Sequence, residues 1–251
     1  MSRTLKLFRI FATTLILTGL IVSIKYLFHH LGWEPIEQTS LHNSVISSVT
    51  FVIGFLLSAT ITDYKESERI PSDFASNLED MYDDATHIHK AYPQFDLAKF
   101  KKQLHIVAQG FSKDARKKSY DARKDIRALG SFFADMESGG VPPNFIVKLK
   151  QQQTHLLRSR QRVNYIQRIT FIPSATILAR SIVIGVIILL TLTNIDPFYG
   201  GLVISGLISF ILIYMLILIQ TISTPFHEAG KTQDDVSLFL VNDAADYLSK
   251  K

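Results

Sequence analysis

Acidic and histidine side chains gather on one predicted helix near the middle of the chain. Their spacings of three and four residues place them on one helical face: Asp80, Asp83, Asp84 and His87. Carboxylate oxygens and imidazole nitrogens bind divalent metal ions, so a metal site is one interpretation. The alternative is a solvated helix face opposite an apolar stripe. We favour this alternative, and we expect neither a metal site nor a cofactor.

A second pattern joins hydroxyl and aromatic side chains along an apolar stretch at residues 44–62. Its members fall on one helical stripe at spacings of three and four residues: Ser44, Ser48, Phe51, Phe55, Ser58 and Thr62. In a membrane helix such a stripe could line a pore, with the phenylalanines as a hydrophobic constriction and the hydroxyls in wetter vestibules. Packing against another helix is the alternative, because small hydroxyl residues also serve helix interfaces in membranes.

One arginine, Arg180, lies inside another apolar stretch. A charge at that depth is expensive in lipid, so its side chain should face protein or water. It could attract an anion, or it could pair with a carboxylate that follows the 44–62 stretch. The candidates for such a pair are Asp63, Glu66 and Glu68, and the sequence leaves both roles open.

The patterns typical of enzyme active sites are absent from the sequence. It contains no glycine-rich phosphate loop, no Gly-x-Ser-x-Gly, no His-Glu-x-x-His and no dinucleotide-binding fingerprint. It also contains no cysteine, which excludes disulfides, thiolate metal sites and cysteine nucleophiles. We therefore expect no enzymatic activity.

Charge is distributed very unevenly along the 251 residues. Hydrophobic residues make up 47% of the chain and charged ones 20%, yet four long stretches are almost free of charge. These stretches cover residues 7–28, 44–62, 171–194 and 198–222. A helix needs about 20 apolar residues to cross a bilayer, so each stretch predicts a membrane span. This pattern excludes a simple soluble enzyme.

Lysine and arginine predict how the spans are oriented. Of the chain's 27 basic residues, 19 lie between positions 63 and 170, whereas the short loops at 29–43 and 194–197 contain none. Because basic loops stay in the cytoplasm, we expect the central segment and both termini on the cytoplasmic side of a bacterial inner membrane. Orientation and contact with lipid headgroups explain the basic charge, so no nucleic acid is expected as a partner.

The predicted fold is an all-α membrane protein in which two transmembrane hairpins flank a cytoplasmic helical domain. The hairpins occupy residues 1–62 and 171–222, the cytoplasmic domain residues 63–170, and a cytoplasmic tail residues 223–251. This arrangement places four spans around one modest domain on the cytoplasmic side.

Within the cytoplasmic domain, apolar residues at spacings of three and four predict several helices. Pro71 and Ser72 are expected to begin the first helix, and Asp96 to cap the second. A third helix is expected over about residues 114–136 from its charge and apolar pattern. A breaker at residues 138–143, rich in glycine and proline, is expected to separate it from a fourth.

Two segments of the chain resemble a known family of membrane proteins. The first is residues 54–69, where a span ends in small and hydroxyl residues and is followed by Tyr64 and a mixed-charge helix start. The second follows the fourth span and reads Thr224-Pro225-Phe226, then Gly230 and Asp234-Asp235-Val236-Ser237. With its four spans, the chain resembles the bacterial bestrophin-like family. It is more distantly similar to bestrophins, which are pentameric anion channels whose second span lines the pore.

The resemblance implies an assembly and a function. Phe51 and Phe55 would stand where bestrophins place the aromatic residues of their neck. Asp234 and Asp235 would lie near a calcium-clasp position, but one pair is too few ligands to predict a calcium site. We therefore expect a cyclic homo-oligomer, such as a pentamer, that conducts ions and most readily small inorganic anions. The alternative is a non-conducting membrane scaffold or sensor whose cytoplasmic helices bind a partner.

Overall fold

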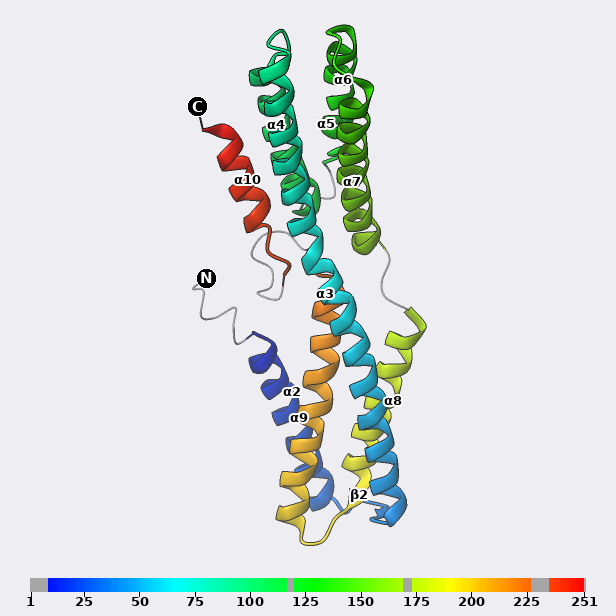
Figure 1. The fold of residues 1–251 in the computed structure, drawn as a ribbon. Coiled ribbons are helices and arrows are strands. Elements are labelled where there is room, and N and C mark those ends of the chain that lie inside the picture. The colour runs from blue at the N-terminus through cyan, green and yellow to red at the C-terminus, as the bar shows by residue number, and fades with distance from the viewer. Residues whose placement is uncertain (1–8, 117–119, 169–172, 227–234, 251) are drawn as a thin grey trace. The chain divides into compact units, whose positions relative to one another are not determined.

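The computed structural model describes residues 9–116, 120–168, 173–226 and 235–250 (Figure 1). The chain divides into two compact units. One unit comprises residues 1–64 and 170–223, and the other comprises residues 65–169 and 224–251. Each unit has its own hydrophobic cluster of buried residues.

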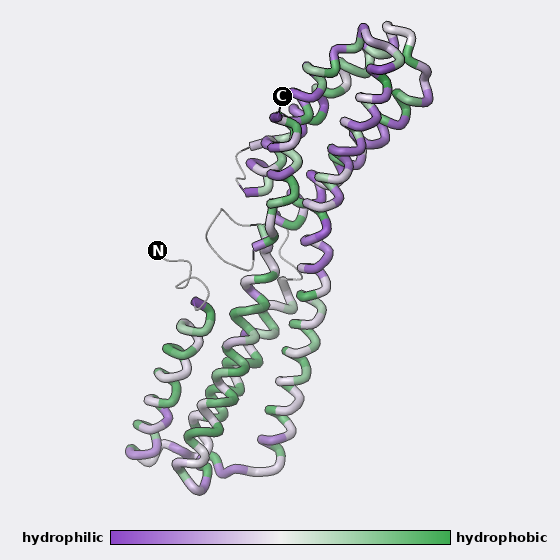
Figure 2. The backbone as a smooth tube through the Cα atoms, turned by 60° about the vertical axis from the view of Figure 1, so that its left-hand side comes forward, coloured by the Kyte–Doolittle hydropathy of each residue, from purple (hydrophilic) through white to green (hydrophobic). Residues whose placement is uncertain are grey.

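The first unit is built from apolar helices, which appear as long hydrophobic stretches in Figure 2. They are α2 (Arg9–His30), the first part of α3 (Ser40–Ala91), α8 (Pro173–Leu192) and α9 (Phe198–Ile222). Each contains a window long and apolar enough to cross a bilayer. The prediction of an all-α fold with four apolar spans is thereby confirmed.

Small residues bring α2 and α9 close together. Thr14 and Thr18 of α2 are buried, as are Gly201, Ser205 and Ser209 of α9. The spacing of four along α9 lets a neighbouring backbone approach, as in small-xxx-small helix pairs of membrane proteins. Thr14 meets its own hydrogen-bonding need by donating to the carbonyl of Ile10 at 2.9 Å.

Two very short strands join the loops at one end of this unit. Strand β1 (Ile36–Glu37) pairs in parallel with β2 (Thr193–Asn194), so that Ile36 lies opposite Thr193. Two residues are too few to leave a recognisable alternation in the sequence, which is why this contact was not predicted.

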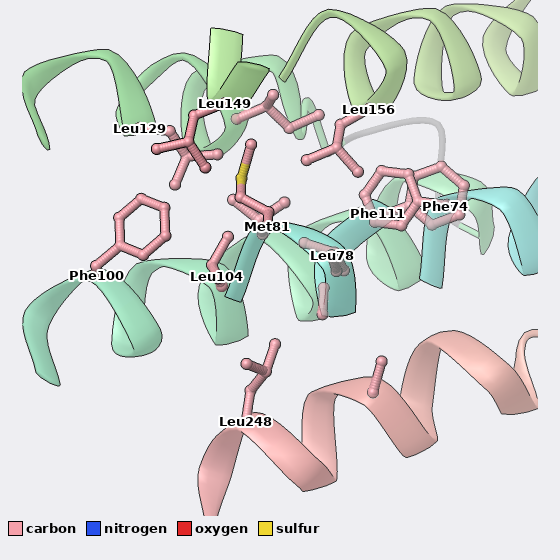
Figure 3. Packing of buried hydrophobic residues seen from close by; sticks show 14 of the residues in the cluster. Phe74, Leu78, Met81, Phe100, Leu104, Phe111, Leu129, Leu149, Leu156 and Leu248 are labelled. Carbon is pink, nitrogen blue, oxygen red and sulfur yellow. The ribbon is translucent and has the colours of Figure 1, made fainter. Parts of the chain in front are cut away.

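The second unit packs helices around a continuous apolar core (Figure 3). It contains the rest of α3 with α4 (Leu97–Arg116), α5 (Arg123–Arg127), α6 (Leu129–Ser138), α7 (Pro143–Arg168) and α10 (Phe239–Ser249). Phe74 stacks on Phe111 with ring centroids 3.8 Å apart. Leu248 brings the C-terminal helix into the same core.

Two local predictions for this unit are confirmed. Asp96 caps α4, because the backbone N–H of Lys99 donates to its Oδ1 at 2.9 Å. The predicted breaker separates α6 from α7, and Gly140 there has a φ of +79°, a conformation that side chains with a Cβ avoid.

The predicted helix start at Pro71 and Ser72 is wrong, because α3 continues through both residues. An interior proline costs a helix about 3 kcal/mol. Ile70 and Phe74, on either side of Pro71, are buried in one core. Each large apolar side chain stabilises by about 1.5–3 kcal/mol when buried, so packing outweighs the lost hydrogen bond.

The single helix predicted over residues 114–136 is also wrong. Helix α4 runs on to Arg116, and two shorter helices, α5 and α6, follow in its place. Asp114 lies in the last turn of α4, and its carboxylate accepts the backbone N–H of Ala122 at 3.3 Å. The charged pattern concealed this break, because Asp114 serves a buried ion pair that the sequence does not reveal.

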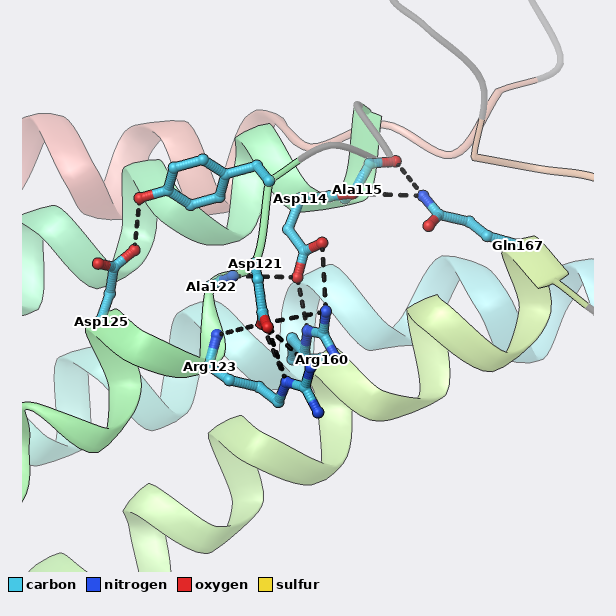
Figure 4. Close-up of polar contacts among 9 residues, drawn as sticks. Asp114, Ala115, Asp121, Ala122, Arg123, Asp125, Arg160 and Gln167 are labelled. Carbon is cyan, nitrogen blue, oxygen red and sulfur yellow. Dashed lines mark hydrogen bonds and ion pairs between the residues drawn. The ribbon is translucent and has the colours of Figure 1, made fainter.

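That ion pair anchors α7 to the end of α4 (Figure 4). Arg160 donates to Asp114 Oδ2 at 2.6 Å, and both side chains are buried. A second carboxylate, that of Asp121, lies 3.2 Å from Arg160. Arg123 donates three side-chain hydrogen bonds and one backbone hydrogen bond to Asp121, and these bonds, with the charge of Arg160, hold the pKa of Asp121 well below its usual value.

Nearby, the O–H of Tyr120 donates to Asp125 Oδ2 at 2.6 Å. Because ionisation of the phenol would break this bond and oppose the carboxylate, the pKa of Tyr120 rises to about 12. The phenol therefore stays neutral at physiological pH and continues to link the loop to α5.

We expect Arg160→Leu to loosen the junction of α4, α5 and α7. Removing one partner of a buried ion pair costs about 3–5 kcal/mol, because the other charge is left unpaired. Hydrogen–deuterium exchange on the purified full chain should show more than hundredfold faster exchange in the last turn of α4. Arg123→Ala, at a more exposed position, is the matched control and should change exchange far less. Unchanged protection in Arg160→Leu would contradict this account.

Candidate functional site

The segment of α3 within the first unit has two different faces. On one face Ile53 is fully buried, and it forms a cluster with Ala179, Val183 and Val186 of α8. Ile46, Val49, Leu56 and Leu57 pack partly against the same cluster. This face therefore holds α3 in its own chain.

The other face carries the predicted stripe. All six of its residues are exposed in the single chain: Ser44, Ser48, Phe51, Phe55, Ser58 and Thr62. We call this surface the α3 stripe. It is not used to pack the chain's own helices, so it is available to water, lipid or another copy.

The hydroxyl groups of the stripe are oriented by their own helix. Ser48 donates to the carbonyl of Ser44 at 2.8 Å, Ser44 to that of Ser40 at 3.2 Å and Thr62 to that of Ser58 at 3.1 Å. The hydroxyl hydrogens of these three residues are thus engaged, and each oxygen presents acceptor lone pairs outward. These groups can accept hydrogen bonds from water without any further partner.

The two aromatic rings of the stripe are its most exposed part. Phe51 is 75% exposed and Phe55 68%, and they lie one helical turn apart. In the described part of the chain, neither ring stacks on another aromatic side chain. Two adjacent rings outside any core form a bulky apolar patch midway along the stripe, with serine and threonine hydroxyl groups on both sides of it.

Arg180 lies on α8 and is also exposed. None of the ion pairs among the described residues involves it. Glu66, one of its three predicted partners, instead pairs with Arg162 at 2.9 Å. The exposed position of Arg180 leaves its guanidinium group available to water or to a bound anion.

The candidate metal ligands Asp80, Asp83, Asp84 and His87 form no metal site within the residues that the structure describes. Asp84 accepts hydrogen bonds from Lys148 at 2.7 Å and from Gln152 at 2.9 Å. Both of its oxygens are therefore engaged. Of the possible calcium-clasp pair, Asp234 lies outside the described residues, as does Gly230.

Sequence analysis missed one charged cluster, which lies at the loop end of the first unit. Lys25 of α2 is only 2% exposed. Its ammonium group donates to Glu34 Oε1 at 3.1 Å, to the carbonyl of Leu190 at 2.9 Å and to that of Thr193 at 2.7 Å. All three donors of the lysine are thereby used.

Through His29, Glu34 also links the Lys25 cluster to the start of α9. Its Oε2 lies 2.7 Å from His29 Nδ1, and the His29 ring stacks on Phe198 of α9 with centroids 3.6 Å apart. The cluster thus joins α2, the following loop, α8 and α9. The signal in the sequence was a lysine inside an apolar run, which requires a partner, and Glu34 is the first acidic residue that follows it.

Comparison with known proteins finds relatives by structure only. No protein-family model and no curated protein sequence matches the chain. A crystal structure of a bacterial bestrophin homolog from Klebsiella pneumoniae superposes with a TM-score of 0.78 at 14% identity, covering 95% of this chain and 97% of that one. A tryptophan-to-alanine variant of that homolog gives a TM-score of 0.81 at 14% identity, covering 97% and 96%.

This chain has the fold of the bacterial bestrophin homologs. A third crystal structure, described as a membrane protein, agrees with a TM-score of 0.77 at 14% identity over 95% of this chain and 97% of that one. The resemblance predicted from short motifs is thus confirmed for the fold over most of the chain.

We expect Lys25→Met to destabilise the loop end of the first unit. Glu34 would keep its buried charge, and two carbonyl groups would lose their donor, at a cost of about 3–5 kcal/mol. Trp33, the chain's only tryptophan, adjoins Glu34, so its fluorescence during thermal unfolding reports on this region. The double variant Lys25→Met with Glu34→Gln should unfold at a higher temperature than Lys25→Met alone. An unfolding midpoint equal to wild type in the single variant would contradict the assignment.

Proposed function

We propose that this protein is an oligomeric ion channel of the bacterial plasma membrane, with the α3 stripe lining its pore. The observation that carries the proposal is the exposure of all six stripe residues, while the opposite face of α3 packs on the chain's own α8. The fold shared with bacterial bestrophin homologs supports the same function. An enzymatic role has no support in the residues described.

Several copies are needed for a pore, because a stripe on the outside of one chain encloses nothing. Rotation about an axis beside α3 brings the stripes of neighbouring copies to face one another. A closed cyclic arrangement is the usual outcome when identical chains assemble through two different surfaces. Bestrophins, which the sequence resembles, are pentamers, and we propose a ring of that kind.

The α3 stripe has the properties required of a gated aqueous path. Hydroxyl oxygens near its two ends would be wetted, because they accept hydrogen bonds from water. Phe51 and Phe55 would repeat around the axis as two adjacent apolar rings. A narrow apolar ring excludes ions by dewetting, without any charged side chain. Opening would require these rings to separate or rotate.

We propose small inorganic anions as the conducted species, on the strength of the resemblance to bestrophins. Arg180, an exposed cation in an apolar helix, supports the same preference. The proposed orientation places both termini and the basic second unit in the cytoplasm, following the distribution of lysine and arginine. Reversal potentials under a salt gradient would measure the preference, since a pore selective for cations reverses with the opposite sign.

We expect the double variant Phe51→Ala with Phe55→Ala to raise basal current in planar bilayers. Loss of both rings widens and hydrates the constriction, so that the closed state conducts. The matched control is Ile184→Ala with Ile188→Ala, an exposed pair one turn apart on α8. The control should conduct like wild type.

A scaffold without a pore makes the opposite prediction for this double variant. If the rings were instead buried in a helix interface between copies, their removal would leave cavities and dissociate the oligomer without any current. A folded, oligomeric double variant that stays silent at voltages and salt gradients of both signs would overturn the proposed constriction.

A further inference from the structure

The second unit carries two exposed surfaces of opposite charge on adjacent helices. One lies on α3, beyond the exposed Glu66 and Glu68, and comprises four further exposed carboxylates: Asp73, Glu79, Asp80 and Asp83. We call these residues the acidic face. The other lies on α7, where Lys150, Arg158 and Arg168 are exposed. We call these residues the basic face.

All charged residues of α7 are basic. Its 26 residues include two lysines and four arginines but no aspartate or glutamate. Two of these cations, Lys148 and Arg162, are paired within the chain with Asp84 and Glu66 of α3. The basic face consists of exposed cations that remain, and within the described residues they form no ion pair.

The residues of the acidic face likewise take no part in the ion pairs between α3 and α7. Asp84 and Glu66 are the carboxylates that form ion pairs with α7, and Asp80 acts on Lys148 through its charge without forming an ion pair. None of the four residues of the acidic face takes part in an ion pair in the described part of the chain. Like charges on one helix face repel each other, so a complementary surface would stabilise both helices.

We propose that the acidic face of one copy docks on the basic face of the next copy in a ring. The inference rests on the proposed oligomer, and it adds which surfaces join the cytoplasmic units. A ring needs two different surfaces on every copy, and each must complement the other. The acidic and basic faces meet this requirement in charge, and they are separate from the α3 stripe.

The two in-chain ion pairs indicate which residues meet. Asp84 pairs with Lys148 and Glu66 pairs with Arg162, and together these pairs fix the relative height of the antiparallel helices to about one helical turn. Rotation about an axis parallel to the helices leaves heights unchanged. Asp80 then lies within about a turn of Lys150 of the next copy, and Asp73 lies near the level of Arg158.

Charge reversal on each face tests the docking. The acidic-face variant is Asp73→Lys with Asp80→Lys, and the basic-face variant is Lys150→Glu with Arg158→Glu. The combined variant carries all four changes. We expect each single-face variant to lower the oligomeric fraction of the purified protein at least fivefold at low salt. The combined variant should recover to within twofold of wild type.

Control substitutions separate direct docking from a general effect of charge. Glu137→Lys on α6 and Lys124→Glu on α5 are exposed reversals outside both faces, and they should leave the oligomer intact. If the single-face variants behave like these controls, the proposed docking is wrong. If losses in the single-face variants add up in the combined variant, the two faces do not bind each other, and the proposal is also wrong.

Cross-linking provides a readout that does not depend on the stability of the oligomer. Because the chain has no cysteine, Asp80→Cys in one tagged copy and Lys150→Cys in a second copy with a different tag form a clean pair. Mild oxidation should join the two tags, whereas Asp80→Cys with Lys124→Cys should not. Absence of the mixed product in an intact oligomer would overturn the docking alone. A monodisperse wild-type monomer would overturn the proposed channel instead.

Discussion

Hydrocarbon offers no hydrogen-bond partner, and this constraint governs the arrangement of the first unit. A charged side chain among its apolar helices has to find a partner within the protein or reach water. Lys25 shows how strictly this applies, because its buried ammonium group uses all three donors on Glu34 and two backbone carbonyls. Those contacts tie the ends of α2 and α8 together, and the short β1–β2 pairing lies beside them.

The same constraint applies to the hydroxyl groups of the α3 stripe. The hydroxyl hydrogens of Ser44, Ser48 and Thr62 are satisfied by the helix's own carbonyls, so these positions are compatible with an apolar setting while their oxygens still accept water. The face opposite the stripe is fixed by packing around Ile53. Because one face is committed to the chain and the other is not, assembly can enclose the uncommitted face without refolding the monomer. This separation of roles underlies the proposed channel.

The long-range features of the fold followed from the sequence because they depend on composition over many residues. Four apolar stretches sufficed to predict four spans, and the phase of residues 44–62 placed the stripe on a single helix face. Local breaks were harder to predict. Pro71 indicated a helix start, but burial of Ile70 and Phe74 keeps the helix continuous. Asp114 resembled a helix start for a different reason, namely that its buried partner Arg160 lies 46 positions away.

The charged cluster around Lys25 could have been anticipated only in part. A lysine within an apolar run implies a partner, and Glu34 is near in sequence. The carbonyls of Leu190 and Thr193 come from the far end of the chain, and no periodicity connects them to α2. Contacts of this kind arise from tertiary structure, which residue spacing does not encode.

If the α3 stripe faces water at a shared axis, single cysteines along it will be accessible from water. Single cysteines would replace Ser48 and Ser58 on the stripe, Thr60 on the buried face and the exposed Leu207 of α9. We expect a membrane-impermeant thiol reagent to modify the protein at positions 48 and 58, and to modify positions 60 and 207 far more slowly. Equal and slow reaction at all four positions would contradict it, because the stripe would then face lipid or a dry interface.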